Sequence, residues 1–127
     1  MNRHLLRLFA LNGFVAVVLG AFGAHALEAS VSPDRLAIWQ TAVHYQMFHS
    51  LGLLACAWLE AVLGRITLLR WSARLFLVGL LLFCGSLYLL VLADAAWLGA
   101  VTPLGGVAWL AAWLLLAAVA RRLPLHN

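Results

Sequence analysis

Residues 75–93 read LFLVGLLLFCGSLYLLVLA, nineteen consecutive positions without a charged side chain. A helix that crosses the hydrocarbon core of a bilayer needs about 20 predominantly apolar residues. A helix that is apolar on all sides has to be surrounded by other apolar matter, either lipid or the core of a large protein. Because the chain has only 127 residues, this stretch predicts a membrane-spanning helix.

Composition extends this prediction to the whole chain. Apolar residues make up 66% and charged residues 9% of the sequence, whereas a soluble domain has roughly 25% charged residues. Three further apolar stretches flank the central one. The sequence therefore predicts one all-α domain over residues 1–127, an integral membrane four-helix bundle with helices at about residues 5–27, 37–63, 75–93 and 103–120.

The arginines predict how the bundle is oriented. All eight cationic side chains are arginines, and seven of them fall on one side of the four predicted spans, with only Arg35 on the other. Cytoplasmic loops carry the excess of positive charge in membrane proteins, so we expect both termini to be cytoplasmic. Trp39 and Trp97 then lie near the outer interface, where tryptophan commonly anchors a span.

The first apolar stretch has a second interpretation. Ala24-His25-Ala26 after a basic start and an apolar run is also the pattern of a cleavable secretory signal. The apolar run is longer than the usual signal core, so we expect it to be retained as a span.

Small residues predict where the helices approach one another closely. They recur at three- and four-residue steps in the first span, a pattern that lets a neighbouring helix pack tightly. The same stripe serves packing within the chain or contact with another chain, and both possibilities stay open. The predicted packing residues are Gly13, Gly20, Gly23, Ala24, Gly85, Gly105 and Gly106.

The outer half of the second span is polar on nearly all sides, from Trp39 to Ser50. At about 1.5 Å of rise per residue, His49 lies close to the bilayer midplane. An unpartnered polar group costs several kcal/mol at that depth, so we expect this segment either to be encircled by the other three helices or to protrude partly into the outer interface. Expected hydrogen-bond partners of His49 are Tyr45, Ser86 and Asn12.

These polar residues also form the candidate ligand site, because polar groups inside a membrane are often functional. A quinone could be hydrogen-bonded by histidine, Tyr45 and Gln46, a haem could be held by histidines of two helices, and a metal could take imidazoles with Glu28. His44 and His49 are five residues apart and point in different directions, which disfavours a metal pair. No cofactor or metal is predicted. The candidate ligand-binding residues are His25, Tyr45, Gln46, His49 and Ser86.

Several classes of function lack a signal in this sequence. The scattered arginines without interleaved aromatic residues do not indicate nucleic-acid binding. Cys56 and Cys84 have no paired spacing, so they indicate neither a disulfide nor a redox motif. There is no nucleophile triad and no phosphate-binding glycine loop, and Glu60 is expected to pair with Arg65 or Arg74.

Four ordered strings, GAFGAHAL at 20–27, WQTAV at 39–43, GSLY at 85–88 and TPLGG at 102–106, resemble the domain-of-unknown-function family 423. The resemblance covers nearly the whole chain and implies a small integral membrane protein without an assigned activity. His25, Tyr45, Gln46, His49, Ser86 and Thr102 match the family strings. His44 does not, and Cys84 stands where the family has serine.

From the sequence we favour a non-enzymatic accessory or scaffolding protein of the inner (plasma) membrane, which associates with itself or with a larger membrane complex. The alternative is a binding protein for a quinone, a haem or a lipid. Its polar pocket would lie in the outer half of the bundle around His25 and His49.

Overall fold

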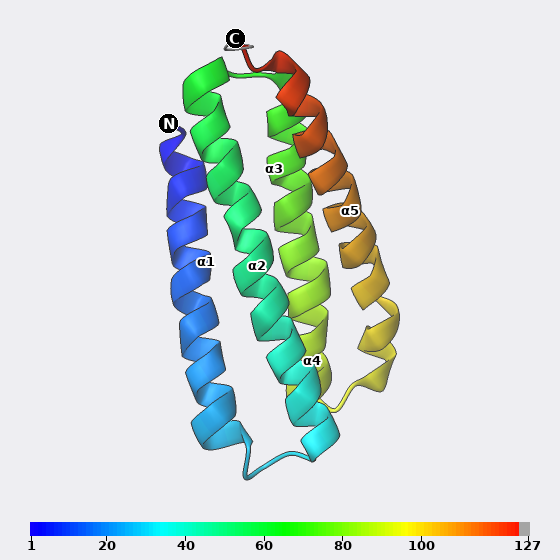
Figure 1. Ribbon diagram of the computed structural model, residues 1–127. Helices are drawn as coiled ribbons and strands as arrows, with labels where there is room; N and C mark the ends of the chain where they lie inside the picture. The colour runs from blue at the N-terminus through cyan, green and yellow to red at the C-terminus, as the bar shows by residue number, and fades with distance from the viewer. Residues whose placement is uncertain (125–127) are drawn as a thin grey trace.

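The computed structural model describes residues 1–124, and the chain is helical within that range, with no β-strand. Four helical stretches are long and apolar enough to cross a membrane, at Arg3–Leu27, Pro33–Leu63, Thr67–Leu92 and Ala96–Arg122. The predicted fold class is confirmed: the chain is an integral membrane four-helix bundle. Figure 1 shows that the first span begins and the last span ends at the same end of the molecule.

Three of the four spans are composite. The first is α1 (Arg3–Phe22) followed by a π-helical segment, η1 (Gly23–Leu27), and the second is a single helix, α2 (Pro33–Leu63). The third consists of α3 (Thr67–Gly79), the π-helical segment η2 (Leu80–Cys84) and α4 (Gly85–Leu92). The fourth consists of a 3₁₀ segment, η3 (Ala96–Ala100), then α5 (Thr102–Val119) and a short 3₁₀ turn, η4 (Ala120–Arg122).

Local chemistry sets where the first two spans begin and end. The side chain of Asn2 accepts hydrogen bonds from the first backbone N–H groups of α1, and Ser32 does the same for α2, whose first residue is Pro33. Both are favourable starts, because the first N–H groups of a helix have no partner within it. Gly64 ends α2 with a φ of 75°, a conformation that glycine adopts without strain.

Two helix starts differ from the sequence prediction. The third span begins at Thr67 rather than at residue 75, so Arg70 and Arg74 belong to a helix and not to a connection. Both arginines are exposed while Leu69 and Ala73 on the same helix are buried. An amphipathic helix end of this kind breaks the uniform hydropathy on which the prediction relied. The second span likewise begins at Pro33 rather than at residue 37.

The helices lie in the order α1, α2, α3 with α4, then α5 (Figure 1). The backbone of α2 packs against α1 on one side and against α3 and α4 on the other, and it approaches α5 at few positions. Side chains of the segment from Trp39 to Ser50 contact all three other spans, but Tyr45, Met47 and Phe48 remain exposed, so the segment is only partly enclosed. Helix α1 packs almost solely on α2. Only 6% of the most apolar 18-residue stretch of the first span is buried, compared with 44% of the corresponding stretches of the second and third spans.

Two tryptophans connect neighbouring helices through packing and a hydrogen bond each. Trp39 of α2 packs on Gly23, where an added Cβ would lie 2.6 Å from the indole, and its Nε1–H donates to the Leu19 carbonyl at 2.8 Å. Trp109 of α5 packs on Gly79 in the same way, and it donates to a backbone carbonyl of α3 at 3.2 Å. Trp39 is 1% exposed, so the expected interfacial anchor is a core residue.

The predicted packing residues divide into three groups. Gly23 and Gly105 allow close approach, because a Cβ on Gly105 would collide with the backbone of α5's neighbour η2. Gly20 and Gly106 have ordinary contact distances of 3.4 and 3.9 Å to the nearest side chain. The remaining three make no close helix contact within this chain, since Gly13 and Gly85 face open space and Ala24 is exposed, and their packing against another chain stays a prediction. Gly52 was not among the predicted packing residues, although the Phe76 ring packs directly on it.

Candidate functional site

His49 lies close to the middle of the 31-residue helix α2, inside a stack of aromatic rings. Its imidazole is 8% exposed and lies parallel to the Trp109 indole of α5, with ring centroids 3.7 Å apart and planes 6° apart. Tyr45, one helical turn earlier, stacks on the same group at 5.5 Å from His49, and Phe83 of η2 lies 4.8 Å from Tyr45. Three spans therefore contribute rings to one site.

One ring nitrogen of His49 forms a hydrogen bond within the described residues and the other does not. Nδ1 lies 2.9 Å from the backbone carbonyl oxygen of Tyr45. Since a carbonyl can only accept, Nδ1 carries the hydrogen, and Nε2 of the neutral ring is left with the lone pair. No protein atom in residues 1–124 hydrogen-bonds Nε2. Every fully buried side-chain nitrogen or oxygen in these residues has a hydrogen-bond partner, so Nε2 is not fully buried.

Two hollows adjoin the His49 side chain. The larger, of about 340 Å³, runs between α2 and α5, and its walls are almost entirely apolar. The smaller, of about 300 Å³, lies on the other side of the same helical turn and includes His44. His49 and Tyr45 line both. The remaining residues of the larger hollow are Phe83, Pro103, Gly106, Val107, Trp109, Leu110 and Trp113.

A second polar group lies at a similar depth but serves the fold. The Gln46 side-chain amide donates to Oδ1 of Asn12 at 3.0 Å, and its oxygen accepts the Tyr88 hydroxyl hydrogen at 2.6 Å. Asn12 donates back to the Gln46 carbonyl at 3.4 Å. These bonds join α1, α2 and α4, and they satisfy the polar groups that lie away from water.

The structure brings together only part of the predicted site. Tyr45 and His49 are in contact, whereas Gln46 turns to the opposite side of α2 toward Asn12. Ser86 bonds the Thr102 hydroxyl at 2.6 Å and does not reach His49. His25 is exposed on η1 and lines neither hollow.

The expected partners of His49 need the same correction. Of Tyr45, Ser86 and Asn12, only Tyr45 bonds the imidazole, and it does so through its backbone carbonyl. The conceivable metal set of imidazoles with Glu28 is also not assembled. Within residues 1–124 no three histidine, cysteine or acidic side chains lie close enough to hold a metal ion.

Sequence reasoning did not identify the residues of α5 that complete the site. Trp109 and Trp113 read as apolar members of a lipid-facing span, although their four-residue spacing places both indoles on one helix face. That spacing was the one available signal. Phe83 gave none, because its approach to Tyr45 depends on how η2 packs beside Gly105.

These features define a small helical membrane protein with four spans and one imidazole held in an aromatic stack near the middle of the bundle. The chain belongs to the family described as "Protein of unknown function (DUF423)", which matches residues 19–106.

Relatives support this membership over most of the chain. It is 43% identical to the UPF0382 membrane protein YwdK of Bacillus subtilis strain 168, over 87% of this chain and 90% of the relative. It is 41% identical to the UPF0382 inner membrane protein YgdD of Escherichia coli K12, over 96% of this chain and 92% of the relative. No solved structure matches the chain.

Proposed function

We propose that this protein is a non-enzymatic membrane protein that binds a flat, lipid-soluble ring compound bearing a hydroxyl group, of which a quinol is the type. The observation that carries the proposal is the free lone pair on Nε2 of His49, which lies beside an apolar hollow in the membrane interior. A polar atom at that depth favours a ligand that supplies a hydrogen-bond donor.

The geometry also supports a preference between the reduced and oxidised forms of such a ring. Nδ1 is held to a carbonyl, so Nε2 can accept a hydrogen bond but cannot donate one while the ring is neutral. A quinol hydroxyl donates, whereas a quinone carbonyl can only accept. Tyr45, which is 44% exposed, supplies the surface on which an aromatic ring packs.

The small number of titratable groups at the larger hollow supports binding without catalysis, because only His49 and Tyr45 carry one among the residues that line it. Gln46 and Ser86 are occupied by bonds that hold the helices together. The imidazole and the phenol can orient a hydroxyl, but no carboxylate lines the hollow to pair with the histidine in general acid–base chemistry. We therefore propose a carrier or sensor of the bound molecule rather than an enzyme that transforms it.

Ring binding can be measured on the purified full chain in mild detergent by quenching of tryptophan fluorescence, with decylubiquinol and decylubiquinone as probes. We expect the quinol to bind more tightly. His49→Phe keeps a ring in the stack but removes the acceptor, which should weaken quinol binding by about fivefold, the value of one hydrogen bond. His25→Phe, at an exposed histidine outside the hollows, is the matched control and should bind normally. Equal affinity for both probes, or equal quinol binding by all three proteins, would contradict the proposal.

The accessory role favoured from the sequence is a second candidate, and the exposure of α1 is the observation that favours it. This helix packs almost solely against α2. Only 6% of the most apolar 18-residue stretch of the first span is buried. We propose that a second copy of the chain packs against the free side of α1, where Gly13 has open space around it.

Cysteine cross-linking in native membranes tests this association. Phe14 of α1 is 68% exposed and Leu114 of α5 is 72% exposed, so they make a matched pair of surface positions. The two native cysteines are buried and do not interfere. We expect Phe14→Cys to form a disulfide-linked dimer and Leu114→Cys to stay monomeric. Cross-linking at both positions to the same extent, or at neither, would refute association through α1.

We further propose that both termini are cytoplasmic and that the protein resides in the inner (plasma) membrane. Seven of the eight arginines lie on the first turns of α1, on the loop between α2 and α3, on α3 or on η4. The chain begins and η4 ends at the same end of the bundle (Figure 1), and the Escherichia coli relative is named an inner membrane protein. Fusion of alkaline phosphatase to residue 30 should be active, and fusion to residue 65 should be inactive. The reverse pattern would overturn the orientation.

A further inference from the structure

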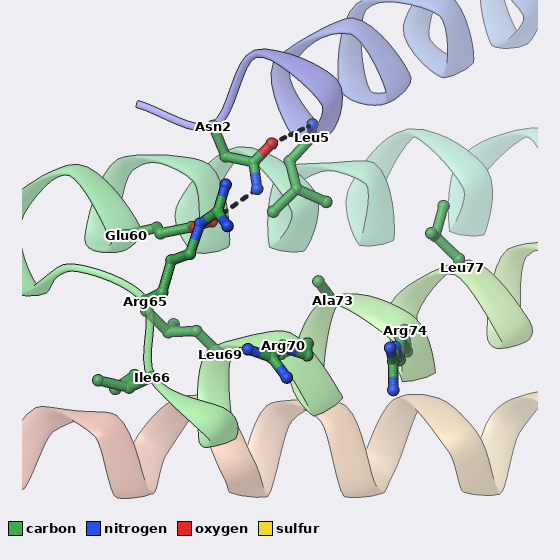
Figure 2. Close-up of a pocket in the computed structure, with 10 residues that line it drawn as sticks. All are labelled: Asn2, Leu5, Glu60, Arg65, Ile66, Leu69, Arg70, Ala73, Arg74 and Leu77. Carbon is green, nitrogen blue, oxygen red and sulfur yellow. Dashed lines mark hydrogen bonds and ion pairs between the residues drawn. The ribbon is translucent and has the colours of Figure 1, made fainter.

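A cavity of about 360 Å³ opens at the end of the bundle where α1 begins. Figure 2 shows its walls: the start of α1, the end of α2, the loop between α2 and α3, and the first turns of α3. It lies at the opposite end of α2 from Arg35 and does not include His49, so it is separate from the proposed ring site. Its lining residues are Asn2, Leu5, Glu60, Arg65, Ile66, Leu69, Arg70, Ala73, Arg74 and Leu77.

The charge of this cavity is positive and only partly compensated. Three arginines and one acid, Glu60, line it. The Glu60 carboxylate accepts a hydrogen bond from Asn2 at 2.7 Å and pairs with Nε of Arg65 at 3.4 Å. Within residues 1–124, Arg70 and Arg74 have no acidic partner, and both are exposed. The guanidinium of Arg74 lies 5.1 Å from the ring of Trp71, a contact that leaves its charge in place.

One wall of the cavity is apolar and leads away from the arginines. Leu69, Ala73 and Leu77 lie on α3 at four-residue spacing, so they share a helix face. Leu69 and Ala73 are buried in the core, whereas Leu77 and Leu5 of α1 are half-buried and form the accessible part of this wall. The wall extends along α3 as far as Leu77, away from the end of the bundle where α1 begins.

We infer that this cavity binds the phosphate headgroup of an acidic membrane phospholipid, with Arg70 and Arg74 on the phosphate and an acyl chain along the apolar wall of α3. Guanidinium groups bind phosphate oxygens with two parallel hydrogen bonds, and basic pockets between spans on the cytoplasmic side are suited to acidic headgroups. Free phosphate shares the same chemistry at the arginines but makes no use of the half-buried Leu5 and Leu77. The apolar wall therefore favours the lipid.

Native mass spectrometry of the full chain, released from mild detergent with added lipid, tests this inference. We expect the protein to retain phosphatidylglycerol over phosphatidylcholine of the same chain length by about tenfold or more. The double substitution Arg70→Gln with Arg74→Gln should abolish that preference. The matched control, Arg7→Gln with Arg121→Gln, removes two charges from the same end of the bundle at residues that do not line the cavity, and it should keep the preference.

Each other outcome overturns the inference. If the unmodified protein shows no preference for phosphatidylglycerol, there is no acidic-lipid site, whether or not the variants fold. If both double variants lose the preference equally, the attraction belongs to total charge and not to this cavity. If a hundredfold excess of inorganic phosphate displaces the bound lipid completely, the cavity is a site for free phosphate. None of these results bears on quinol binding near His49.

Discussion

Replacement of Gln46 by leucine should destabilise the bundle by about 1 to 3 kcal/mol. Gln46 is 4% exposed, and its amide bonds Asn12 at 3.0 Å and accepts from Tyr88 at 2.6 Å. Interhelical hydrogen bonds in membranes are worth about 0.6 kcal/mol on average and up to about 1.7 kcal/mol. Three such bonds are lost, because the Gln46 amide also donates to the Asn12 backbone carbonyl at 3.2 Å, and the side chains of Asn12 and Tyr88 are left without this partner, which sets the range.

The interaction between Gln46 and Tyr88 can be isolated by a double-mutant cycle. Gln46→Leu and Tyr88→Phe should each destabilise the protein, and the double variant should lose less than the sum by about 0.6 to 1.7 kcal/mol. The free energy of unfolding can be measured by titration with sodium dodecyl sulfate in mixed micelles, followed by circular dichroism. Gln40→Leu, at an exposed position on the same helix, is the control and should change stability little. Additivity within about 0.3 kcal/mol would refute the reasoning.

Three further outcomes are expected. Gly79→Ala should destabilise the bundle by about 1 to 3 kcal/mol, because the added Cβ would overlap an indole. Gly85→Ala is the control and should not destabilise it, because Gly85 faces open space. Equal melting temperatures of the two variants would contradict the packing argument. Arg35→Gln should lower the melting temperature more than Asp94→Asn. Both variants lose the exposed Arg35–Asp94 ion pair, which contributes about 0 to 1 kcal/mol, but only Arg35→Gln also loses the hydrogen bond to the Leu90 carbonyl at 2.7 Å. The reverse order would contradict this prediction. His49→Ala should lower the melting temperature through loss of a buried hydrogen bond worth about 1 to 3 kcal/mol and of the aromatic stack, and an unchanged melting temperature would refute a structural role for this imidazole.

Membrane insertion and the number of spans could be predicted from the sequence because they follow from composition and length. A run such as 75–93 has no charge and no alternative location except lipid. The start of the third span could not be found in this way. Arg70 and Arg74 lower the local hydropathy as a connecting loop would, yet they lie on the exposed side of a regular helix, where long arginine side chains reach the headgroup region.

The candidate site was predictable only in its centre. The polar residues of the second span pointed to His49 and Tyr45, since a polar group at that depth requires a partner. The sequence could not show which side of α2 each residue faces in the assembled bundle. Gln46 follows Tyr45 directly, but it turns toward α1 while Tyr45 turns toward α5. The spacing of His25 from His49 likewise gave no measure of how far apart η1 and the aromatic stack lie.

The two tryptophan contacts explain why the helices pair as they do. Each indole lies on a glycine at the end of a regular helix, Gly23 at the end of α1 and Gly79 at the end of α3, and each donates to a carbonyl within that helix. In both places a π-helical segment follows at once. A π-helical turn is wider than an α-helical turn and carries an additional residue, so it shifts which side chains face the partner beyond that point. The indole can approach only because glycine has no Cβ, and the N–H donor bonds a backbone group that lipid could not satisfy. The first hairpin (α1 with α2) and the second (α3 and α4 with α5) therefore use one device to fix their register, although the two halves share no sequence repeat.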